Sequence, residues 1–262
     1  MRRVIILMIL MLVPELVFCQ QSDRKPITYK PGEKINYVIQ YGVLTGGVAS
    51  IEIHNDTLNG KPVWHSKLEA KTTGITDAIF RVLDIYESYV DPQTEMPVKS
   101  IRNIREGRYR KYNEVLFDHK SRPDSAILTS DLTGVHITEK NIYDILSCFY
   151  WVRNRILPEK QLVKGDMITV MTWFTDELYP IRLRYMGSEN VKTRHGKIHC
   201  YKFNPVTETG RLFTTEDGVS FWFSADKNFL PVKIRFDIFV GSFTVEMTDY
   251  SGLVYPLELK KK

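Results

Sequence analysis

Apolar and polar residues alternate along most of this chain, at the two-residue period of a β-strand that buries one face. The alternating segments are rich in β-branched and aromatic residues, and Asn59-Gly60 between two of them favours a tight hairpin turn. The pattern predicts short strands at residues 35–41, 48–54, 63–71, 84–91, 98–105, 108–117, 124–129, 135–138, 167–174, 181–186, 197–203, 220–223, 232–239 and 243–250.

One stretch breaks the alternation. Between residues 141 and 157 the apolar positions follow three- and four-residue steps, as they do on one face of a helix. Asn141 followed by Asp144 resembles a helix start, and Pro158 marks the end. We therefore predict one long helix over 141–157, together with a short helical turn over 75–82.

Many short strands, one long helix and no βαβ alternation indicate a mainly β fold. We predict a single domain over 31–255. It is a curved antiparallel sheet, or a partly open barrel, with the long helix packed in its concave side. Residues 20–30 are polar and contain a proline, so we expect a loose leader into the domain.

The N-terminus carries an export signal. Residues 1–3 include two arginines, residues 4–11 are apolar, and Pro14 and Glu15 interrupt the run before it reaches the ~20 residues of a membrane span. This pattern is typical of a cleavable secretory signal peptide over residues 1–19. It predicts an exported, periplasmic protein with no transmembrane segment after cleavage.

The three cysteines leave two questions open. If Cys19 were acylated and retained, the protein would be lipid-anchored, but Phe18 is larger than the residue that usually precedes such a cysteine, so soluble export is favoured. Cys148 and Cys200 would remain after cleavage, and an oxidising compartment permits a disulfide between them. The alternative is two buried thiols, since one lies in the predicted helix and the other in a predicted strand.

Composition excludes several classes of protein. At 43% hydrophobic and 26% charged, the chain is neither disordered nor an integral membrane protein. Its 36 basic and 31 acidic residues are mixed along the sequence, so we expect no nucleic-acid partner. The basic run over 99–111 alternates between strand faces and favours a solvated surface. The weaker alternative is a cationic rim that meets acidic lipid headgroups.

The motifs of common chemistries are missing from the sequence. It has no Gly-x-Ser-x-Gly elbow, no phosphate-binding glycine loop and no His-Glu-x-x-His zinc signature. His195 and His199 are four residues apart, but they fall in a predicted hairpin and need not converge. We predict no metal, no cofactor and no enzymatic activity. An enzyme of unrecognised type would need acids such as Asp176 or Glu177 to meet a histidine.

Several segments, taken in order, carry a resemblance to a known family. They are 31–37, Tyr41-Gly42, 143–153, 164–166, 196–200, 221–224 and 231–234. In this order they resemble the DUF3108 family of exported bacterial proteins of unknown function. The resemblance covers about residues 31–250 and implies an envelope-facing, mostly β protein with no assigned catalytic residues. By fold-level analogy, it is also similar to periplasmic carriers of lipoproteins and lipids.

Aromatic residues are the richest source of a candidate site. The chain has 13 Phe, 14 Tyr and 4 Trp, which either fill the interior of a curved sheet or line an apolar cavity in it. A hollow of roughly 300 Å³ or more is needed to favour a small ligand. The candidate cavity residues are Ile145, Phe149 and Val152 on the helix, facing Trp173, Phe221 and Phe223.

Two functions follow from these candidates. The first is a non-enzymatic module of the cell envelope that binds an apolar or lipid-like ligand, such as a lipid or another envelope component. The alternative is a structural or assembly factor that binds an envelope protein through its surface, without a small-molecule ligand. An exposed sheet edge or a large apolar surface patch would favour the alternative.

Overall fold

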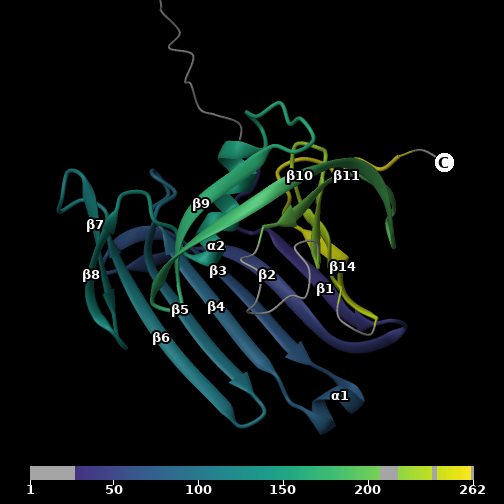
Figure 1. Cartoon of the computed structure of the whole chain (residues 1–262), viewed down its shortest axis with the longest axis horizontal. Helices are drawn as coiled ribbons and strands as arrows, with labels where there is room; N and C mark the ends of the chain where they lie inside the picture. The colour runs from purple at the N-terminus through teal and green to yellow at the C-terminus, as the bar shows by residue number, and fades with distance from the viewer. Residues whose placement is uncertain (1–26, 207–217, 238–240, 261–262) are drawn as a thin grey trace, which may run out of the picture.

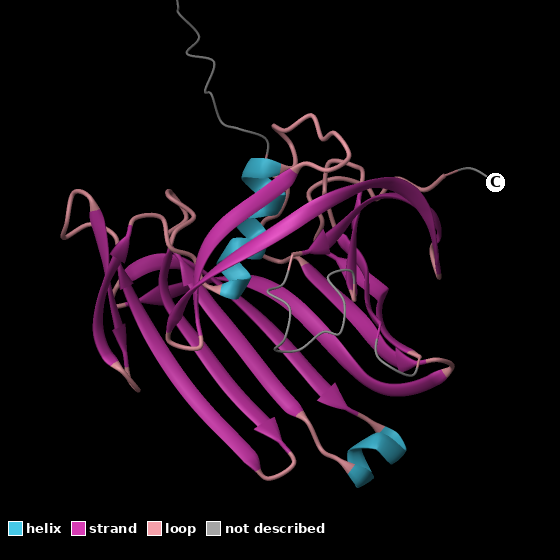
Figure 2. Cartoon of the chain, in the orientation of Figure 1, coloured by secondary structure: helices cyan, strands magenta, loops and turns pink. Residues whose placement is uncertain are grey.

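The computed structural model describes residues 27–206, 218–237 and 241–260. Within these residues a single antiparallel sheet holds 14 strands (Figures 1 and 2). Each predicted strand has its counterpart among them: β1 (Lys34–Tyr41), β2 (Leu44–Leu58), β3 (Lys61–Thr72), β4 (Leu83–Val90), β5 (Pro97–Glu106), β6 (Tyr109–Asp118), β7 (Ser125–Ser130), β8 (Gly134–Glu139), β9 (Met167–Phe174), β10 (Glu177–Thr193), β11 (Gly196–Pro205), β12 (Val219–Ser224), β13 (Pro231–Asp237) and β14 (Ser242–Ser251).

The strands form two antiparallel meanders, β1 to β8 and β9 to β14, which pair with each other through β1 and β14. The order in the sheet is β8-β7-β6-β5-β4-β3-β2-β1-β14-β13-β12-β11-β10-β9. The pairing of β1 with β14, from Lys34 opposite Ser251 to Tyr41 opposite Phe243, connects the first strand of the chain to the last. Strands β8 and β9 are therefore the two edges of the sheet, and the segment between them carries the helix.

The sheet curves until its edges approach each other, but it does not close. The ring of His136 on β8 lies 4.8 Å from the ring of Trp173 on β9. Beside β9, Tyr143 donates its backbone N–H to the carbonyl of Met171 and accepts from the N–H of Trp173. The prediction of a mainly β fold, with one curved antiparallel sheet that stays partly open, is confirmed.

Two glycines show how the sheet obtains its curvature. The pairing of β10 with β11 shifts register between Tyr185 and Gly187, and Gly187 has a φ of 114°, which favours glycine. A Cβ added to Gly47 on β2 would lie 2.5 Å from the carbonyl oxygen of Lys71 on β3. Both positions allow a bend or a close approach that larger residues would resist.

The predicted long helix over 141–157 is wrong in its length. The α-helix α2 (Ile145–Trp151) has 7 residues, and a π-helical turn η1 (Val152–Ile156) follows it. The α-helix begins late because residues 142–143 run beside β9, and because Asn141 has a φ of 61°. A second short helix, α1 (Gly74–Ile79), lies where the helical turn was predicted.

A capping box fixes the start of α2. The carboxylate of Asp144 accepts hydrogen bonds from the backbone N–H groups of Leu146 and Ser147, at 2.8 and 3.1 Å. The hydroxyl of Ser147 in turn accepts from the backbone N–H of Asp144. These bonds satisfy the free N–H groups of the first turn, so a buried helix can begin at this position.

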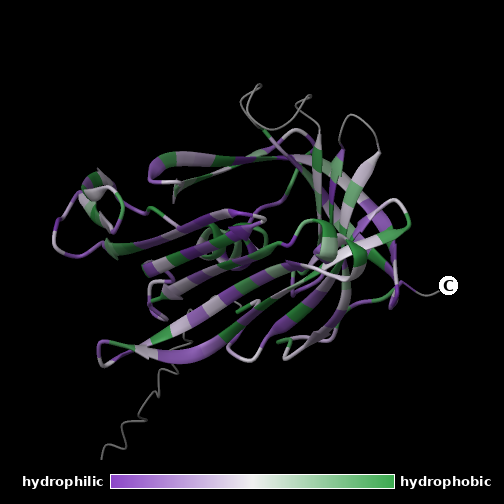
Figure 3. Ribbon diagram, turned by 90° about the horizontal axis from the view of Figure 1, so that it is seen from below, coloured by the Kyte–Doolittle hydropathy of each residue, from purple (hydrophilic) through white to green (hydrophobic). Residues whose placement is uncertain are grey.

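Helix α2 lies inside the curve of the sheet, between its two halves (Figure 3). On one side, Leu146 and Tyr150 belong to a core cluster with residues of β1, β2, β11, β12, β13 and β14. On the other side, Cys148 and Val152 pack with residues of β9, β10, β11 and β12. The short helix thereby organises most of the buried apolar side chains of the described chain.

A buried ion pair holds the helical segment in place. Arg153 is fully buried and makes a bidentate contact with Glu33, with Nη1–Oε1 at 2.7 Å and Nη2–Oε2 at 3.0 Å. Its Nη2 also donates to the backbone carbonyl of Asn228 at 3.0 Å. The guanidinium carbon lies 5.3 Å from the ring centroid of Phe149 and 5.5 Å from that of Tyr150. One side chain therefore joins η1, the start of β1 and the turn before β13.

The start of the described chain is also packed. Thr28 and Tyr29, at the end of the segment predicted as a loose leader, are buried, and the N–H of Thr28 donates to Asn154 Oδ1. The predicted signal peptide over residues 1–19, including Cys19, lies outside the described residues. Among the residues that are described, no helix is long and apolar enough to span a membrane.

Candidate functional site: an apolar cavity beside helix α2

An apolar cavity of about 320 Å³ lies beside α2, on the side that faces β1, β2, β3, β10, β12, β13 and β14. We call it the inner cavity. Its floor is the face of α2 and η1 that carries Ile145, Phe149 and Val152. Ala49 and Ile51 of β2 and Leu183 of β10 are among the residues that form the facing walls. The cavity is thus bounded by parts of the chain that are far apart in sequence.

The structure brings five of the six predicted cavity residues to the inner cavity: Ile145, Phe149, Val152, Phe221 and Phe223. The helix and β12 meet directly, since the rings of Phe149 and Phe223 stack with their centroids 6.1 Å apart. This contact packs the helix face against β12, whose Phe221 and Phe223 the sequence predicted it to face.

Trp173 lies elsewhere. It packs with Val115, Phe117, Leu128 and Ile142 in a separate cluster under β6 and β7. Its strand, β9, is an edge of the sheet, and its side chain points toward the other edge. Trp173 thus does not line the inner cavity, but it lines a smaller hollow together with Ile145 and Leu146. Alternation shows which face of a strand is buried, but not which elements that face meets.

Sequence reasoning missed most of the wall opposite the helix. Ala49 and Ile51 alternate on β2, and Ile181 and Leu183 alternate on β10, so each pair shares one face of its strand. That signal was visible in the sequence and predicted inward-facing residues. It did not indicate that both pairs would line the same cavity, because β2 and β10 are brought together by the curvature of the sheet.

Among the described residues, no charged side chain lines the inner cavity. The hydroxyl of Tyr37 donates to the carbonyl of Pro231 at 3.0 Å, and burial raises the pKa of this phenol well above its usual range. Burial likewise raises the pKa of the Cys148 thiol, so that it stays protonated. A neutral, largely hydrocarbon surface of this kind favours an uncharged apolar group.

The two described cysteines are both free and buried. Cys148 borders the inner cavity, whereas Cys200 on β11 does not line it. Burial raises the pKa of Cys200 to about 12. The alternative of two buried thiols therefore describes this structure, and the two thiols differ in their access to the cavity.

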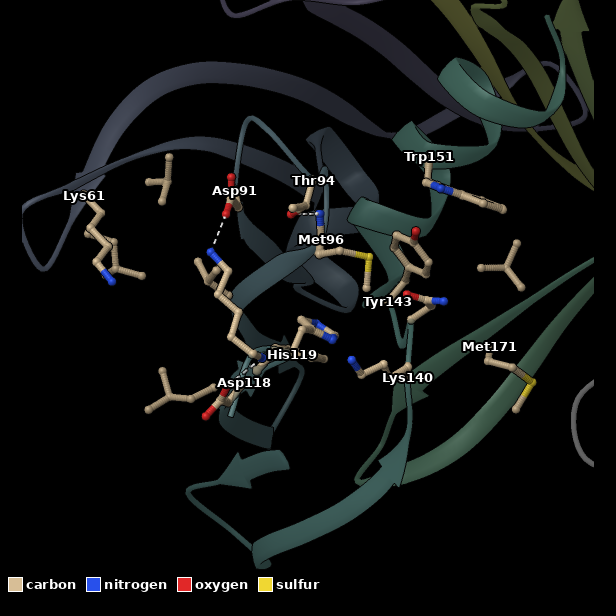
Figure 4. Close-up of a pocket in the computed structure, with 18 of the residues that line it drawn as sticks. Lys61, Asp91, Thr94, Met96, Asp118, His119, Lys140, Tyr143, Trp151 and Met171 are labelled. Atoms are coloured by element: carbon tan, nitrogen blue, oxygen red, sulfur yellow. Dashed lines mark hydrogen bonds and ion pairs between the residues drawn. The ribbon is translucent and has the colours of Figure 1, made fainter. Parts of the chain in front are cut away.

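A second, wider hollow of about 980 Å³ is lined in part by Trp151 of α2 (Figure 4). We call it the outer groove. Its walls are partly apolar, with Met96, Tyr143 and Trp151 among the residues that line it. Charged groups also line the groove, and Lys120 Nζ pairs with Asp91 Oδ2 at 3.0 Å.

The polar groups of the outer groove serve mainly the local backbone. The carboxylate of Asp118 accepts from the N–H groups of Lys120 and Ser121 and from the hydroxyl of Ser121. Burial lowers the pKa of His119, so its neutral form is favoured. The outer groove is therefore more open and more polar than the inner cavity, and a less selective site for an apolar group.

The side chains considered for catalysis or metal binding lie apart. Asp176 Oδ1 accepts from Asn113 Nδ2 at 3.3 Å. His195 Nε2 lies 3.2 Å from the carbonyl oxygen of Thr248, whereas His199 Nδ1 lies 3.1 Å from Asn190 Oδ1. Across the described ranges, no group of three or more His, Cys, Asp or Glu side chains is placed to hold a metal ion.

An open antiparallel sheet wrapped around one short helix defines the class of this protein as β-barrel-like. The chain belongs to the family described as "Protein of unknown function (DUF3108)", whose family model matches residues 36–248. This match confirms the family resemblance found in the sequence. None of the curated proteins matches the chain.

A solved structure shares the fold. It is the crystal structure of a beta-barrel-like protein of the domain of unknown function DUF1849 from Brucella abortus, with a TM-score of 0.54 and 7% sequence identity. The likeness covers 84% of this chain and 96% of that chain. At this identity the likeness shows the architecture alone.

Proposed function

We propose that this protein is an exported, non-enzymatic module that binds an apolar or lipid-like ligand in the inner cavity. The observation that carries the proposal is a hollow of about 320 Å³ with uncharged walls, next to the helix at the centre of the fold. Its volume lies at the lower end of the ~300–1,000 Å³ of ligand pockets. A single hydrocarbon chain or a small apolar molecule suits it better than a bulky polar one.

The energetics of packing support a ligand. Protein interiors are close-packed, so the apolar side chains around a hollow of about 320 Å³ lack the packing partners that core side chains have. An apolar occupant would supply these contacts without leaving buried polar groups unpaired.

The location predicted from the sequence fits the same ligand class. The signal peptide predicted over residues 1–19 would deliver the chain to the cell envelope, where molecules with hydrocarbon chains are abundant. The hydroxyl of Tyr37, which lines the cavity, already donates to the carbonyl of Pro231. The cavity therefore offers few polar groups that could orient a polar headgroup. We therefore place the apolar part of the ligand inside and any headgroup outside.

A test begins with protein purified gently from its own envelope and weighed by native mass spectrometry. We expect a co-purified species that extraction with organic solvent removes. The extracted protein is then titrated with N-phenyl-1-naphthylamine, a neutral apolar fluorophore, and should bind it saturably. An apo mass together with no saturable fluorophore binding would contradict the proposal.

Two variants localise the binding. Ala49→Phe places a ring in the inner cavity and should lower the fluorophore affinity by about tenfold or more, since it removes most of the available volume. The matched control is Ala78→Phe, an exposed position in α1. Equal binding by the two variants would show that the fluorophore binds elsewhere.

One observation favours the alternative of a surface that binds an envelope protein. Strand β8 is an edge of the sheet, and its Val135 and Ile137 are 67% and 57% exposed. An apolar edge strand can pair with a strand of another chain. If the cavity test fails, Val135→Lys and Ile137→Lys should abolish capture of the envelope partner, which cross-linking in intact cells would measure.

A further inference from the structure

The end of the sheet that carries α1 exposes apolar side chains to an unusual degree. Ile75 and Ile79 of α1 are 81% and 80% exposed, and Val43 in the turn between β1 and β2 is 91% exposed. No residue of α1 is buried. Single exposed apolar side chains are common, but several that gather at one end of a molecule can mark a site of interaction.

Backbone contacts bring these side chains to one surface, which we call the α1 end. Thr73, which precedes α1, donates its N–H to the carbonyl of Gly46 near the start of β2, at 3.1 Å. After α1, the carbonyl of Arg81 accepts from the N–H of Gly107 in the turn between β5 and β6, at 2.8 Å. The ring of Phe80 lies directly against Gly107. Figure 1 shows α1 projecting beyond the strands at this end.

Exposed arginines lie on the chain segments next to α1. Arg81, Arg105, Arg108 and Arg110 are all exposed, and they lie after α1 and around the turn between β5 and β6. In the part of the chain that the structure describes, none of the four forms an ion pair with a carboxylate. Arg110 donates to backbone carbonyls, including that of Gly107 at 2.8 Å.

The acidic residues near this end are engaged with other groups. Asp77 accepts from the hydroxyl of Thr72 at 2.8 Å, and Asp84 accepts from the backbone N–H of Arg105 at 3.1 Å. Glu106 lies close to Asp84, and burial together with that neighbour raises the pKa of Glu106. These acids keep their charge, but the four arginines outnumber Asp77, Asp84 and Glu106, so the α1 end keeps a net positive charge around its apolar tips.

We propose that the α1 end docks on a membrane surface that contains anionic lipids. Ile75, Ile79 and Val43 enter the boundary between headgroups and acyl chains, and the arginines contact lipid phosphates. This arrangement combines the two forces that hold peripheral proteins on membranes, apolar insertion and attraction to anionic headgroups. The inference goes beyond ligand binding in the inner cavity and does not depend on it.

The pattern favours a membrane over another copy of this chain. Four arginines without acidic partners would repel the same four in a second copy. The apolar side chains also stand on two separate tips, the β1–β2 turn and α1, rather than on one flat patch. A fluid lipid surface accommodates separate tips, whereas a rigid protein surface needs shape complementarity.

The test uses the mature chain in co-sedimentation with two kinds of vesicle. One contains phosphatidylcholine alone, and the other contains phosphatidylcholine with phosphatidylglycerol. We expect at least about tenfold stronger binding to the anionic vesicles, decreasing as salt is added. Strong binding to both kinds, or to neither, would overturn the proposal, and so would an acidic protein partner that binds the α1 end in the absence of vesicles.

Paired variants assign the binding to this surface. Ile75→Ser with Ile79→Ser, and separately Arg108→Gln with Arg110→Gln, should each weaken vesicle binding by about tenfold. The matched controls are Val135→Ser with Ile137→Ser on the exposed face of β8, and Lys192→Gln with Arg194→Gln near the β10–β11 turn. All these side chains are exposed, so the variants should fold, and circular dichroism verifies this.

The outcome separates this inference from the proposed function. The controls should bind anionic vesicles within about twofold of the unchanged protein, and Ala49→Phe should do the same. If the control pairs lose as much binding as the α1-end pairs, attraction to the whole protein surface explains the result and the inference fails. Neither outcome of the vesicle experiment changes what the fluorophore titration says about the inner cavity.

Discussion

The inner cavity and the α1 end both carry isoleucine and other apolar side chains, but these side chains differ in their burial and in their neighbours. In the cavity, Ile145 and Phe149 face other apolar side chains, and none of the described residues that line the space is charged. At the α1 end, Ile75 and Ile79 are exposed to solvent, and the arginines of the neighbouring segments form no ion pair with a described carboxylate. The comparison teaches that the neighbours of an isoleucine, rather than its type, decide whether it forms core, cavity or contact surface.

The two helices explain the difference. Helix α2 begins with a complete capping box and is followed by Arg153, which is held by the buried Glu33. Helix α1 begins at Thr73, whose side chain makes no capping hydrogen bond, and it buries no residue. Helix α2 is therefore a structural element that the cavity depends on, whereas α1 can change without cost to the core.

The largest effect is expected from the buried ion pair. Glu33→Gln leaves Arg153 buried without a carboxylate, and breaking such a pair from one side costs about 3–5 kcal/mol. Urea unfolding measures this loss. At the α1 end, Arg105→Gln removes an exposed charge and should change the free energy of unfolding by no more than about 0.5 kcal/mol. Similar losses for both variants would remove the distinction between the two regions.

Truncating an apolar side chain should likewise cost much more free energy of unfolding at α2 than at the α1 end. Leu146 of α2 is buried in the core, so Leu146→Ala should lower the free energy of unfolding by about 2–5 kcal/mol. Ile79→Ala at the α1 end should change it by less than about 0.5 kcal/mol. If Ile79→Ala were as destabilising as Leu146→Ala, then α1 would pack against the core in solution.

Asp144, which caps α2, should make the stability of the folded protein depend on pH. Burial raises the pKa of Asp144 above its value in the unfolded chain, so the folded protein holds this proton more tightly. The resulting stabilisation is complete below the unfolded pKa, about 4, and is lost as the pH rises through the folded pKa.

The variant Asp144→Asn lacks this titration and keeps a residue that can cap a helix. It should therefore be about as stable as the unchanged protein at low pH, where both side chains are neutral, and become the more stable of the two as the pH rises. Urea midpoints measured across that range follow the difference. A variant that instead becomes the less stable of the two as the pH rises would mean that the hydrogen bonds to this carboxylate outweigh its burial, and that its pKa is lowered.

The smallest expected effect is on the rate at which the Cys148 thiol is modified, with no change in the free energy of unfolding. Cys148 borders the inner cavity, and burial raises its pKa, so methyl methanethiosulfonate should modify it slowly. A bound apolar ligand should slow that reaction further without affecting Cys200, and peptide mass mapping distinguishes the two sites. A thiol introduced by Ile79→Cys should react rapidly and be protected by anionic vesicles rather than by the ligand.

The candidate site could be predicted from the sequence only in part. The helix face of Ile145, Phe149 and Val152 followed from a three- and four-residue period, and Phe221 and Phe223 followed from alternation in their strand. Trp173 lies outside the inner cavity, and the walls contributed by β2 and β10 were missed. The length of α2 was overestimated because the period continues through residues that tertiary contacts hold in another conformation.

Local patterns were sufficient for the strands, the antiparallel arrangement, the existence of a central helix and the family. The strands and the helix depend on side chains a few residues apart, whose directions the backbone geometry sets, and the family followed from the order of short segments along the chain. The cavity volume, its opposite wall and the position of Trp173 depend instead on how far the sheet curves. That curvature rests on long-range contacts, such as β1 with β14 and Arg153 with Glu33, which join residues that no local period relates.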